Sequence, residues 1–560
     1  MRKIILLSLC FFAIVNAKAT TYYVSTTGSN ANSGTLASPF ATPNYAALQC
    51  VAGDIIDIRG GTYNLTAIIR LQHSNMTIRS HAGEWAILIA PVNNTNIDYC
   101  IYMQNPGDSG FVIDRLEIIG GYYYGIKTES YFDGRDNDPN DIGVNNVTIK
   151  NCKIHDTGRD CIKITPASND IKVLNCEIYN SGVGPANTTA QNAEGIDNVN
   201  GDNMQIYGCY IHDIYSNGLY LKGGAANGVV ENNLVINCGE GGILLGYWET
   251  DEEWFDSQTT NTSWHENING TVKNNIVLNC QFEGIGLYAA RNAKILNNTV
   301  VNCGITQHGA FFIGQGMIFA GPVGAEINPP TRDIIIRNNI FQTATASSRP
   351  VFELRAQNGA TMTGTNTIEY NKYYKGGSAV QFNYYGTNYN LGVWQSASGF
   401  DILGSTVGNP DLNANYHLNS SSSCINSGYN TIPDVAIDYD GNTRTSTDIG
   451  ADEFNATVFL TIPPANTTIG TGIAGSTLGI NEFVNEKSNI KVFPTFTNSI
   501  IYITLEASKS ETVSIIDLSG KLVKTKNINT KDEVDFSDLP NGVYILKFIK
   551  SNQFIKIIKY

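Results

Sequence analysis

The chain has 560 residues, of which 15% are charged and 54 are glycine, and its formal net charge is −14. This acidic balance argues against nucleic acid as a partner, because binding to phosphates needs basic patches. Few charges together with many glycines are typical of an extracellular all-β protein.

The first 19 residues have the pattern of a secretory signal peptide. Arg2 and Lys3 precede the apolar run ILLSLCFFAIV, and Ala17-Lys18-Ala19 supplies a cleavage site of the A-x-A type. No later stretch approaches the ~20 apolar residues that a membrane-spanning helix needs. We therefore predict a signal peptide over residues 1–19 and an exported, soluble protein without a transmembrane segment.

The next segment carries two recognisable phrases, TYYVSTTGSNANSGTLASPF and GDIIDIRGGTY. It resembles the opening of many secreted β-helix carbohydrate enzymes. The resemblance implies that residues 20 to about 90 cap the end of a solenoid and form its first turns.

One short phrase then returns six times between residues 147 and 301. The copies are VTIKNCKIHDTGRDCIKI, IKVLNCEIYNSG, MQIYGCYIHDIYSNGLYLKGG, GVVENNLVINCGEGGILLG, GTVKNNIVLNCQFEGIGLY and AKILNNTVVNC. They align Asn151, Asn175, Gly208, Asn232, Asn274 and Asn297, at intervals of 24, 33, 24, 42 and 23 residues. A shortest interval near 23 residues indicates one structural unit with loops inserted into some copies, as in a solenoid.

The repeats predict an all-β solenoid, a parallel β-helix. Apolar and polar residues alternate over short runs such as GLYLK at 218–222, with Leu219 and Leu221 on one face. The next column of the alignment contains Cys152, Cys176, Cys209, Asn233, Asn275, Asn298 and Asn339, and its stacked amides can bond from turn to turn. The families that the chain resembles are right-handed.

Ten cysteines remain after the signal peptide, and most of them follow the repeat. Cys238, Cys280 and Cys303 form a second column beside that of Cys152, Cys176 and Cys209. Stacked positions favour small apolar ladder residues over a disulfide framework.

Each copy also contains a strand whose outward positions include ionisable and polar side chains. Because neighbouring turns stack about 4.8 Å apart, equivalent residues should lie side by side. We expect one outward patch made of Asp160, Lys163, Glu194, Asp197, Asn217, Tyr220 and Lys222.

The longest insertions, near residues 130–142, 183–193 and 247–267, flank this strand and predict a ligand groove beside it. The last insertion holds Trp248, Trp254 and Trp264, and clustered tryptophans on a polar loop favour stacking on sugars. We predict that the substrate-binding residues are Tyr220, Asn217, Trp248, Trp254, Trp264, Tyr288 and Arg291.

The patch is similar to the site of family 9 polysaccharide lyases and their relatives, although the acidic D-D-G-x-D phrase of those enzymes is absent. The resemblance implies a calcium-assisted lyase that abstracts the proton α to a uronate carboxylate. Lys222 would be the base, with Asp197 and Lys163 as further catalytic residues, and Asp160, Glu194 and Asp197 would hold the calcium.

Two alternatives remain open from the residues. Paired carboxylates drawn from Asp160, Glu194, Asp197 and Glu283 could instead make a glycoside hydrolase. The same solenoid could also be a glycan-binding or adhesin scaffold without activity, since fold does not imply function.

The C-terminal part falls into three pieces. GNPDLNANYHLN to DIGADEF resembles the closing segment of secreted β-helix proteins and ends the solenoid domain, residues 20–455. Residues 456–487 form a linker rich in Thr, Gly and Pro. Residues 488–560, with ETVSIIDLSGKLVKT and LPNGVYILKFIK, resemble the sorting domain of type IX secretion in Bacteroidetes-like bacteria, which implies a small β-sandwich, that secretion machinery as partner and a secreted or cell-surface protein. We expect a monomer.

Overall fold

The computed structural model describes residues 19–132, 141–251, 255, 261–319, 327–356, 362–431 and 434–454, and parts of 490–559 (490–493, 496–497, 500–505, 510–517, 521–540, 542–550 and 553–559). The chain divides into two compact units, Met1–Leu478 and Gly479–Tyr560. The predicted signal peptide (residues 1–18 of it) and linker lie outside the described residues. Within the described part, no helix has the length and apolar character needed to cross a membrane.

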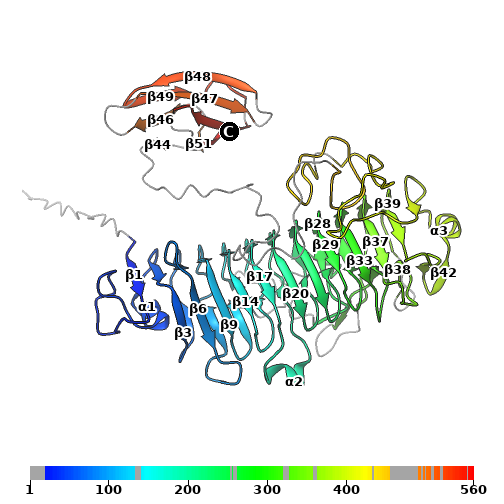
Figure 1. The fold of residues 1–560 in the computed structure, drawn as a ribbon, viewed down its shortest axis with the longest axis horizontal. Helices are drawn as coiled ribbons and strands as arrows, with labels where there is room; N and C mark the ends of the chain where they lie inside the picture. Colours follow the sequence, from blue (N-terminus) through cyan, green and yellow to red (C-terminus); the bar gives the residue numbers. More distant parts are fainter. Residues whose placement is uncertain are drawn as a thin grey trace, which may run out of the picture. The chain divides into compact units, whose positions relative to one another are not determined.

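The first unit is a parallel β-helix built from three long sheets, which we call sheets I, II and III (Figure 1). Sheet I contains β1 (Thr21–Val24), β2 (Ile55–Ile58), β5 (Thr77–Ser80), β8 (Val112–Asp114), β13 (Thr148–Lys150), β16 (Lys172–Leu174), β19 (Gln205–Tyr207), β23 (Val229–Glu231), β28 (Thr271–Lys273), β32 (Lys294–Leu296), β36 (Ile335–Arg337) and β39 (Thr367–Glu369).

Sheet II follows sheet I in each turn. It contains β3 (Gly61–Asn64), β6 (Ala86–Ala90), β9 (Leu116–Gly120), β14 (Lys153–His155), β17 (Glu177–Tyr179), β20 (Tyr210–Ile214), β24 (Leu234–Cys238), β29 (Ile276–Leu278), β33 (Thr299–Cys303), β37 (Ile340–Thr343), β40 (Lys372–Tyr374) and β43 (Thr406–Val407).

Sheet III completes each turn and carries the predicted patch. It contains β4 (Ile69–Leu71), β7 (Tyr99–Met103), β10 (Tyr124–Thr128), β15 (Ile162–Ile164), β18 (Ile196–Val199), β21 (Leu219–Lys222), β25 (Ile243–Leu245), β30 (Ile285–Tyr288), β34 (Phe311–Gly314), β38 (Phe352–Leu354), β41 (Phe382–Tyr384) and the antiparallel β42 (Thr387–Tyr389).

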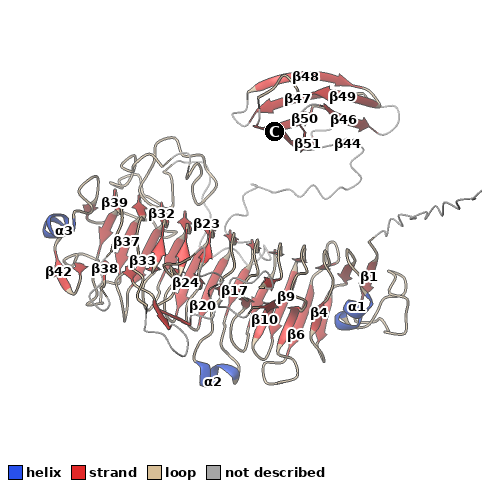
Figure 2. Cartoon of the chain, turned by 180° about the vertical axis from the view of Figure 1, so that it is seen from behind, coloured by secondary structure: helices blue, strands red, loops and turns tan. Residues whose placement is uncertain are grey.

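Short strands pair in the loops between the long sheets. They are β11 (Ser130–Tyr131) with β12 (Ile142–Gly143), β22 (Ala225–Ala226) with β27 (Asn267–Ile268) and β31 (Ala290–Arg291), and β26 (Glu249–Asp251) with β35 (Met317–Phe319). Helix α2 (Ala186–Ala190) lies in one of the predicted insertions and projects from the solenoid (Figure 2).

The tight turn between sheets I and II explains the first column of the repeat. Asn151, Gly208 and Asn297 have φ angles of 53°, 63° and 52°, in the left-handed region. Asparagine and glycine adopt this conformation at less cost than other residues, so each of the six aligned copies carries one or the other, whereas Arg115 and Tyr370 occupy the equivalent position in an earlier and a later turn.

The second column forms a ladder inside the solenoid. The Asn275 side chain donates to Asn298 Oδ1 over 3.0 Å, and the Asn298 side chain donates to Asn339 Oδ1 over 3.0 Å. The ladder continues from the cysteines, since the Cys209 N–H donates to Asn233 Oδ1. The ten cysteines of the described residues are all free and buried.

Both ends of the apolar core are covered by helices (Figure 1). α1 (Pro43–Gln49) buries Ala46 and Ala47 at the first turns. α3 (Leu391–Ser398) buries Trp394, which packs against Phe352 and Phe382 of the last turns. These helices shield the apolar side chains at both ends of the core from solvent.

The closing segment, residues 408–454, packs against later turns of sheet II. The side chain of Asn232 donates to the carbonyls of Asp438 and Tyr439, and Asn297 donates to Asp448 O over 3.0 Å. Tyr439 is buried against Leu234 of β24. Backbone carbonyls of this segment therefore satisfy the amides at the solenoid's corner.

The second unit is a small β domain of two sheets around one core. The first sheet contains β44 (Ile490–Phe493), β46 (Ile500–Leu505) and β49 (Lys531–Asp535). The second contains β45 (Phe496–Thr497), β51 (Gln553–Lys559), β50 (Gly542–Phe548), β47 (Glu511–Asp517) and β48 (Leu522–Ile528). Ile503 of the first sheet and Ile515 of the second are buried in the same cluster.

We expect Asn298→Ala to lower the free energy of unfolding by about 2–4 kcal/mol, because buried partners above and below lose their hydrogen bonds. Asn298 is fully buried and also donates to Val272 O. The exposed Asn388 is the matched control, and Asn388→Ala should cost less than about 1 kcal/mol. Thermal or chemical denaturation measures the free energy of unfolding of both variants. Equal losses of stability would contradict a stabilising role for the inner asparagine ladder.

Candidate functional site

The register of sheet III aligns the outward residues of successive turns. Lys127 pairs with Lys163, Lys163 with Asp197, Asp197 with Tyr220, and Tyr220 with Leu244. This is the column that the repeat alignment predicts. Side chains far apart in sequence therefore lie on one face of the solenoid.

Three carboxylates from two turns of this face form a cluster, which we call the acidic cluster. Oxygen atoms of Asp160, Glu194 and Asp197 all lie within 4.8 Å of one another. The Glu194 N–H donates to Asp160 Oδ1 over 3.1 Å, and Ser216 donates to Glu194 Oε1 over 2.9 Å. Within the part of the chain that the structure describes, one oxygen of Asp160 (Oδ2) and one of Asp197 (Oδ1) have no hydrogen-bond partner.

Most residues of the predicted outward patch are buried. Asp160 and Glu194 are 0% exposed, Asp197 and Tyr220 are 1% exposed and Asn217 is 2% exposed. They point away from the solenoid core, but Arg159 and the rings of Tyr124 and Tyr247 lie beside them. Sequence periodicity gives the face of a strand, whereas burial also depends on what the loops place over it.

Lys163 is committed to an ion pair. Its Nζ donates to Asp197 Oδ2. Burial alone would lower the pKa of Lys163, but the negative charge of Asp197 and its neighbours outweighs burial and raises that pKa. Lys163 therefore stays protonated and neutralises part of the cluster, which does not suit it to act as the base.

The three carboxyl groups respond differently to their surroundings. Burial and then the charge of Asp197 raise the pKa of Glu194 to about 7, and the same two causes raise the pKa of Asp160 well above its usual range. Burial opposes ionisation of Asp197 as well, but Lys163 and Lys222 outweigh it and lower the pKa of Asp197. The cluster thus combines Asp197, whose lowered pKa keeps it ionised, with two carboxyl groups whose raised pKa values favour the protonated form.

Lys222, the predicted base, stands at the end of β21 beside this cluster. Its Nζ lies 4.5 Å from the ring centre of Tyr220 and 4.7 Å from that of Tyr247. Within the described part of the chain, the amine makes no hydrogen bond or ion pair, and it is half-buried. Lys222 therefore lacks the direct ion pair that commits Lys163 to Asp197.

Glu266 supports the turn after Lys222 and was not predicted from sequence. It is fully buried, and its Oε2 accepts the Gly223 N–H over 2.8 Å. Burial raises the pKa of Glu266 to about 7. The repeat alignment does not include Glu266, because this residue lies in an inserted loop, directly before β27.

A groove of about 460 Å³ lies on the outward face of sheet III, mainly over turns later than the acidic cluster. It is lined by Asn217, Glu240, Leu244, Tyr247, Trp248, Phe282, Glu283, Tyr288, Gln307, His308, Phe312, Gly314, Gln315 and Arg355. Trp248 and Tyr247 come from the insertion that was predicted to form a wall.

The floor of the groove contains a hydrogen-bonded network. Glu283 Oε1 accepts the Tyr288 hydroxyl, and Glu283 Oε2 contacts His308 Nδ1, both over 2.5 Å. The His308 ring stacks on Phe312, and the Arg355 guanidinium lies 5.1 Å from the ring centre of Phe312. These groups offer apolar ring faces and charged edges to a ligand.

The structure brings together only part of the predicted binding set. Asn217, Trp248 and Tyr288 line the groove, and Tyr220 contacts Lys222 beneath it. Trp264 packs on Phe255, and neither Trp264 nor Arg291 lines the groove. Trp254 lies outside the described residues. Phe312 was missed, although extending the sheet III column beyond Gly286 reaches it.

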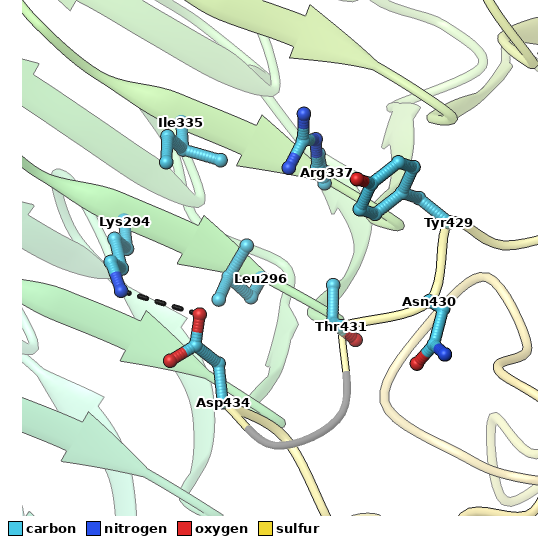
Figure 3. A pocket seen from close by; sticks show the side chains of 8 residues that line it. All are labelled: Lys294, Leu296, Ile335, Arg337, Tyr429, Asn430, Thr431 and Asp434. Carbon is cyan, nitrogen blue, oxygen red and sulfur yellow. Dashed lines mark hydrogen bonds and ion pairs between the residues drawn. The ribbon is translucent and has the colours of Figure 1, made fainter.

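A smaller cavity of about 90 Å³ lies between sheet I and the closing segment (Figure 3). Lys294 faces Asp434 at 3.3 Å, and the Arg337 guanidinium lies 4.0 Å from the ring centre of Tyr429. These contacts hold the closing segment to the solenoid, and the cavity is too small for a sugar ring.

The acidic cluster fits a calcium ion. Its donors are all carboxylate oxygens, which calcium prefers, and two of these buried oxygens have no other partner. Asp160, Glu194 and Asp197 carry more negative charge than Lys163 alone can neutralise when all three are ionised.

Residues 140–321 match the family model described as a right handed beta helix region. The solenoid is a right-handed β-helix. Residues 491–559 match the secretion system C-terminal sorting domain. The second match confirms the predicted sorting domain and indicates type IX secretion to the outside or surface of the cell. No curated protein matches the chain.

Several solved β-helix structures are similar to this chain. One is the complex of XylC with xylose, at 12% identity and a TM-score of 0.47, covering 77% of this chain and 98% of that one. Another is pectate lyase Pel9A, at 14% identity and a TM-score of 0.42, covering 78% and 97%. A third is a rhamnogalacturonan lyase, at 16% identity and a TM-score of 0.43, covering 62% and 87%. Structural similarities at such low sequence identity do not show the activity of this chain.

We expect the acidic cluster to weaken the fold as pH rises in the presence of chelator. The unfolded chain releases the Glu194 proton near pH 4.5, while the folded chain holds it to about pH 7, so stability is lost as pH rises between these values. At pH 8 the loss reaches roughly 3 kcal/mol. Glu194→Gln avoids it and should unfold at a higher temperature than wild type at pH 8, but not at pH 4.5.

The control is Glu231→Gln on sheet I, which removes a carboxylate paired with Lys273 at the surface. It should not reproduce a difference that grows with pH. A gap between wild type and Glu194→Gln that stays constant from pH 4.5 to pH 8 would contradict the assignment.

Proposed function

We propose that this protein is an extracellular polysaccharide lyase that cleaves a uronate-containing polymer by β-elimination. The observation that carries the proposal is the Lys222 amine, which makes no ion pair with the described residues and lies beside Tyr220 and Tyr247, the second of which lines the groove. Among the residues predicted to be catalytic, Lys163 and Asp197 are committed to an ion pair with each other, whereas Lys222 is not.

The reaction needs one base close to the carbon that carries the uronate carboxylate. In its neutral form, Lys222 Nζ takes the proton from that carbon and becomes an ammonium group, and the electron pair of the broken C–H bond forms a double bond to the neighbouring carbon. The bond from that neighbour to the glycosidic oxygen breaks, and the leaving oxygen takes a proton from solvent. The products are an unsaturated uronate end and a new reducing end.

The acidic cluster serves the reaction through charge. Asp160, Glu194 and Asp197 would hold a calcium ion, and such an ion supplies positive charge that neutralises a uronate carboxylate. Lys163 stays paired with Asp197 and keeps that carboxylate in place. Lys222 takes no part in these pairs and stays available to the substrate.

The groove supports binding of a chain of sugars. Trp248 is 44% exposed and, with Tyr247, offers ring faces for sugar stacking. Arg355 pairs with Glu353 at 2.6 Å, and nearly half of its side chain stays exposed beside the groove, where a guanidinium suits a carboxylate. Tyr247 lines the groove and also packs on Lys222, so a polymer bound in the groove would extend toward the base.

A glycoside hydrolase is the second candidate, and Glu194 favours it. With its pKa at about 7, Glu194 could donate a proton to a leaving glycosidic oxygen while Asp197 stays ionised. Both side chains are essentially unexposed, however, whereas hydrolysis needs a carboxylate in contact with the sugar. Burial therefore favours a charge-holding role for these groups.

The proposal is tested by incubating the protein with pectate, alginate, glycosaminoglycans and neutral glycans, with calcium or with chelator. We expect a rise in ultraviolet absorbance from unsaturated uronate on at least one acidic polymer, and chelator should suppress it. New reducing ends without that absorbance would favour the hydrolase. Binding without any product would indicate a glycan-binding solenoid.

On the polymer that is cleaved, Lys222→Ala should lower kcat by roughly 10²–10⁴-fold with little change in melting temperature, because the amine contributes little to packing. Lys172→Ala, on sheet I, is the matched control and should keep full activity. Lys163→Ala should lower both activity and stability, since it leaves Asp197 buried without its partner. Full activity of Lys222→Ala would refute the assignment of the base.

A further inference from the structure

A second group of metal-ligating side chains lies in the closing segment, apart from the sugar groove. Ligand atoms of His417, Asp440 and Asp452 lie within 4.8 Å of one another. His417 Nε2 is 2.8 Å from Asp440 Oδ2. The three side chains are 0%, 1% and 2% exposed.

One oxygen in this group has no donor among the described residues. Asp452 Oδ2 accepts the Leu418 N–H over 2.8 Å, but Asp452 Oδ1 is buried without a hydrogen-bond partner in that part of the chain. A buried carboxylate oxygen in this state costs free energy unless a cation or a proton satisfies it. Asp452 belongs to the same compact group of ligand residues as His417.

The surroundings hold more buried acid than base. Five carboxyl groups of the closing segment are buried, namely Asp438, Asp440, Asp448, Asp452 and Glu453. The described cations buried with them in this segment are Arg444, which pairs with Glu453 at 3.0 Å, and His417 when protonated.

We propose that His417, Asp440 and Asp452 bind one divalent transition-metal ion, with zinc as the best match. Imidazole and carboxylate ligands together suit zinc, whereas calcium favours oxygen ligands alone, as in the acidic cluster. The proposal does not depend on the lyase activity.

The ion would act as a cross-link within the closing segment. Its ligands come from positions 417, 440 and 452, and Tyr439 beside Asp440 is buried against Leu234 of sheet II. Joining these positions fixes the loop that presents the carbonyls of Asp438 and Tyr439 to Asn232. The metal site therefore stabilises the cover of the solenoid.

The test uses the purified full chain, stripped with chelator, dialysed, and then titrated with zinc, manganese or calcium. We expect one equivalent of zinc to remain bound after a second dialysis and to raise the melting temperature by several degrees. Asp452→Asn should lose both the retained zinc and the rise. Asp434→Asn, an exposed carboxylate of the same segment, and Asp160→Asn, in the acidic cluster, should keep both.

His417→Gln provides a second variant if Asp452→Asn does not fold. Failure of the wild-type protein to retain zinc, or retention that both variants share, would overturn the proposal. The first result would reduce the group to a buried His417–Asp440 ion pair. Since activity is not the readout, failure of the lyase proposal would leave this outcome unaffected.

Discussion

The backbone register between successive turns is the constraint on which the site depends. Parallel strands bonded 4.7–4.9 Å apart place each residue beside its equivalent in the next turn. Lys163 thereby meets Asp197, and Asp197 meets Tyr220, although 34 and 23 residues separate them. The inner asparagine ladder and the left-handed turn fix that register, because slipping a turn would break both.

Register also concentrates charge of one sign, and this determines the chemistry that the face can perform. Asp160, Glu194 and Asp197 come from adjacent turns and are buried together, with Lys163 as the partner of Asp197. Lys222, one turn further, faces the same cluster without an ion pair among the described residues. One lysine is therefore fixed as a counter-charge, and the other stays available to a substrate.

Much of the fold and the composition of the acidic cluster follow from the repeat alone. The columns of Asn151 and Cys152 predict the turn and the ladder, because one conformation recurs in every copy. Exposure did not follow, because Arg159 and the rings of Tyr124 and Tyr247 lie beside the buried Asp160 and Glu194. The groove was located only in part, because His308 and Arg355 follow Gly304, where the copies become irregular.

In the proposed lyase, Lys222 faces the reacting carbon of a uronate while the acidic cluster holds a cation. The most direct measurement is a diffraction structure of the Lys222→Ala variant with calcium and an oligosaccharide of the cleaved polymer. We expect calcium to lie among Asp160, Glu194 and Asp197. The hydrogen on the uronate α-carbon should point to the space that the Lys222 amine occupies in the wild-type protein. A glycosidic oxygen bound at Glu194, with no cation in the cluster, would contradict it and favour hydrolysis.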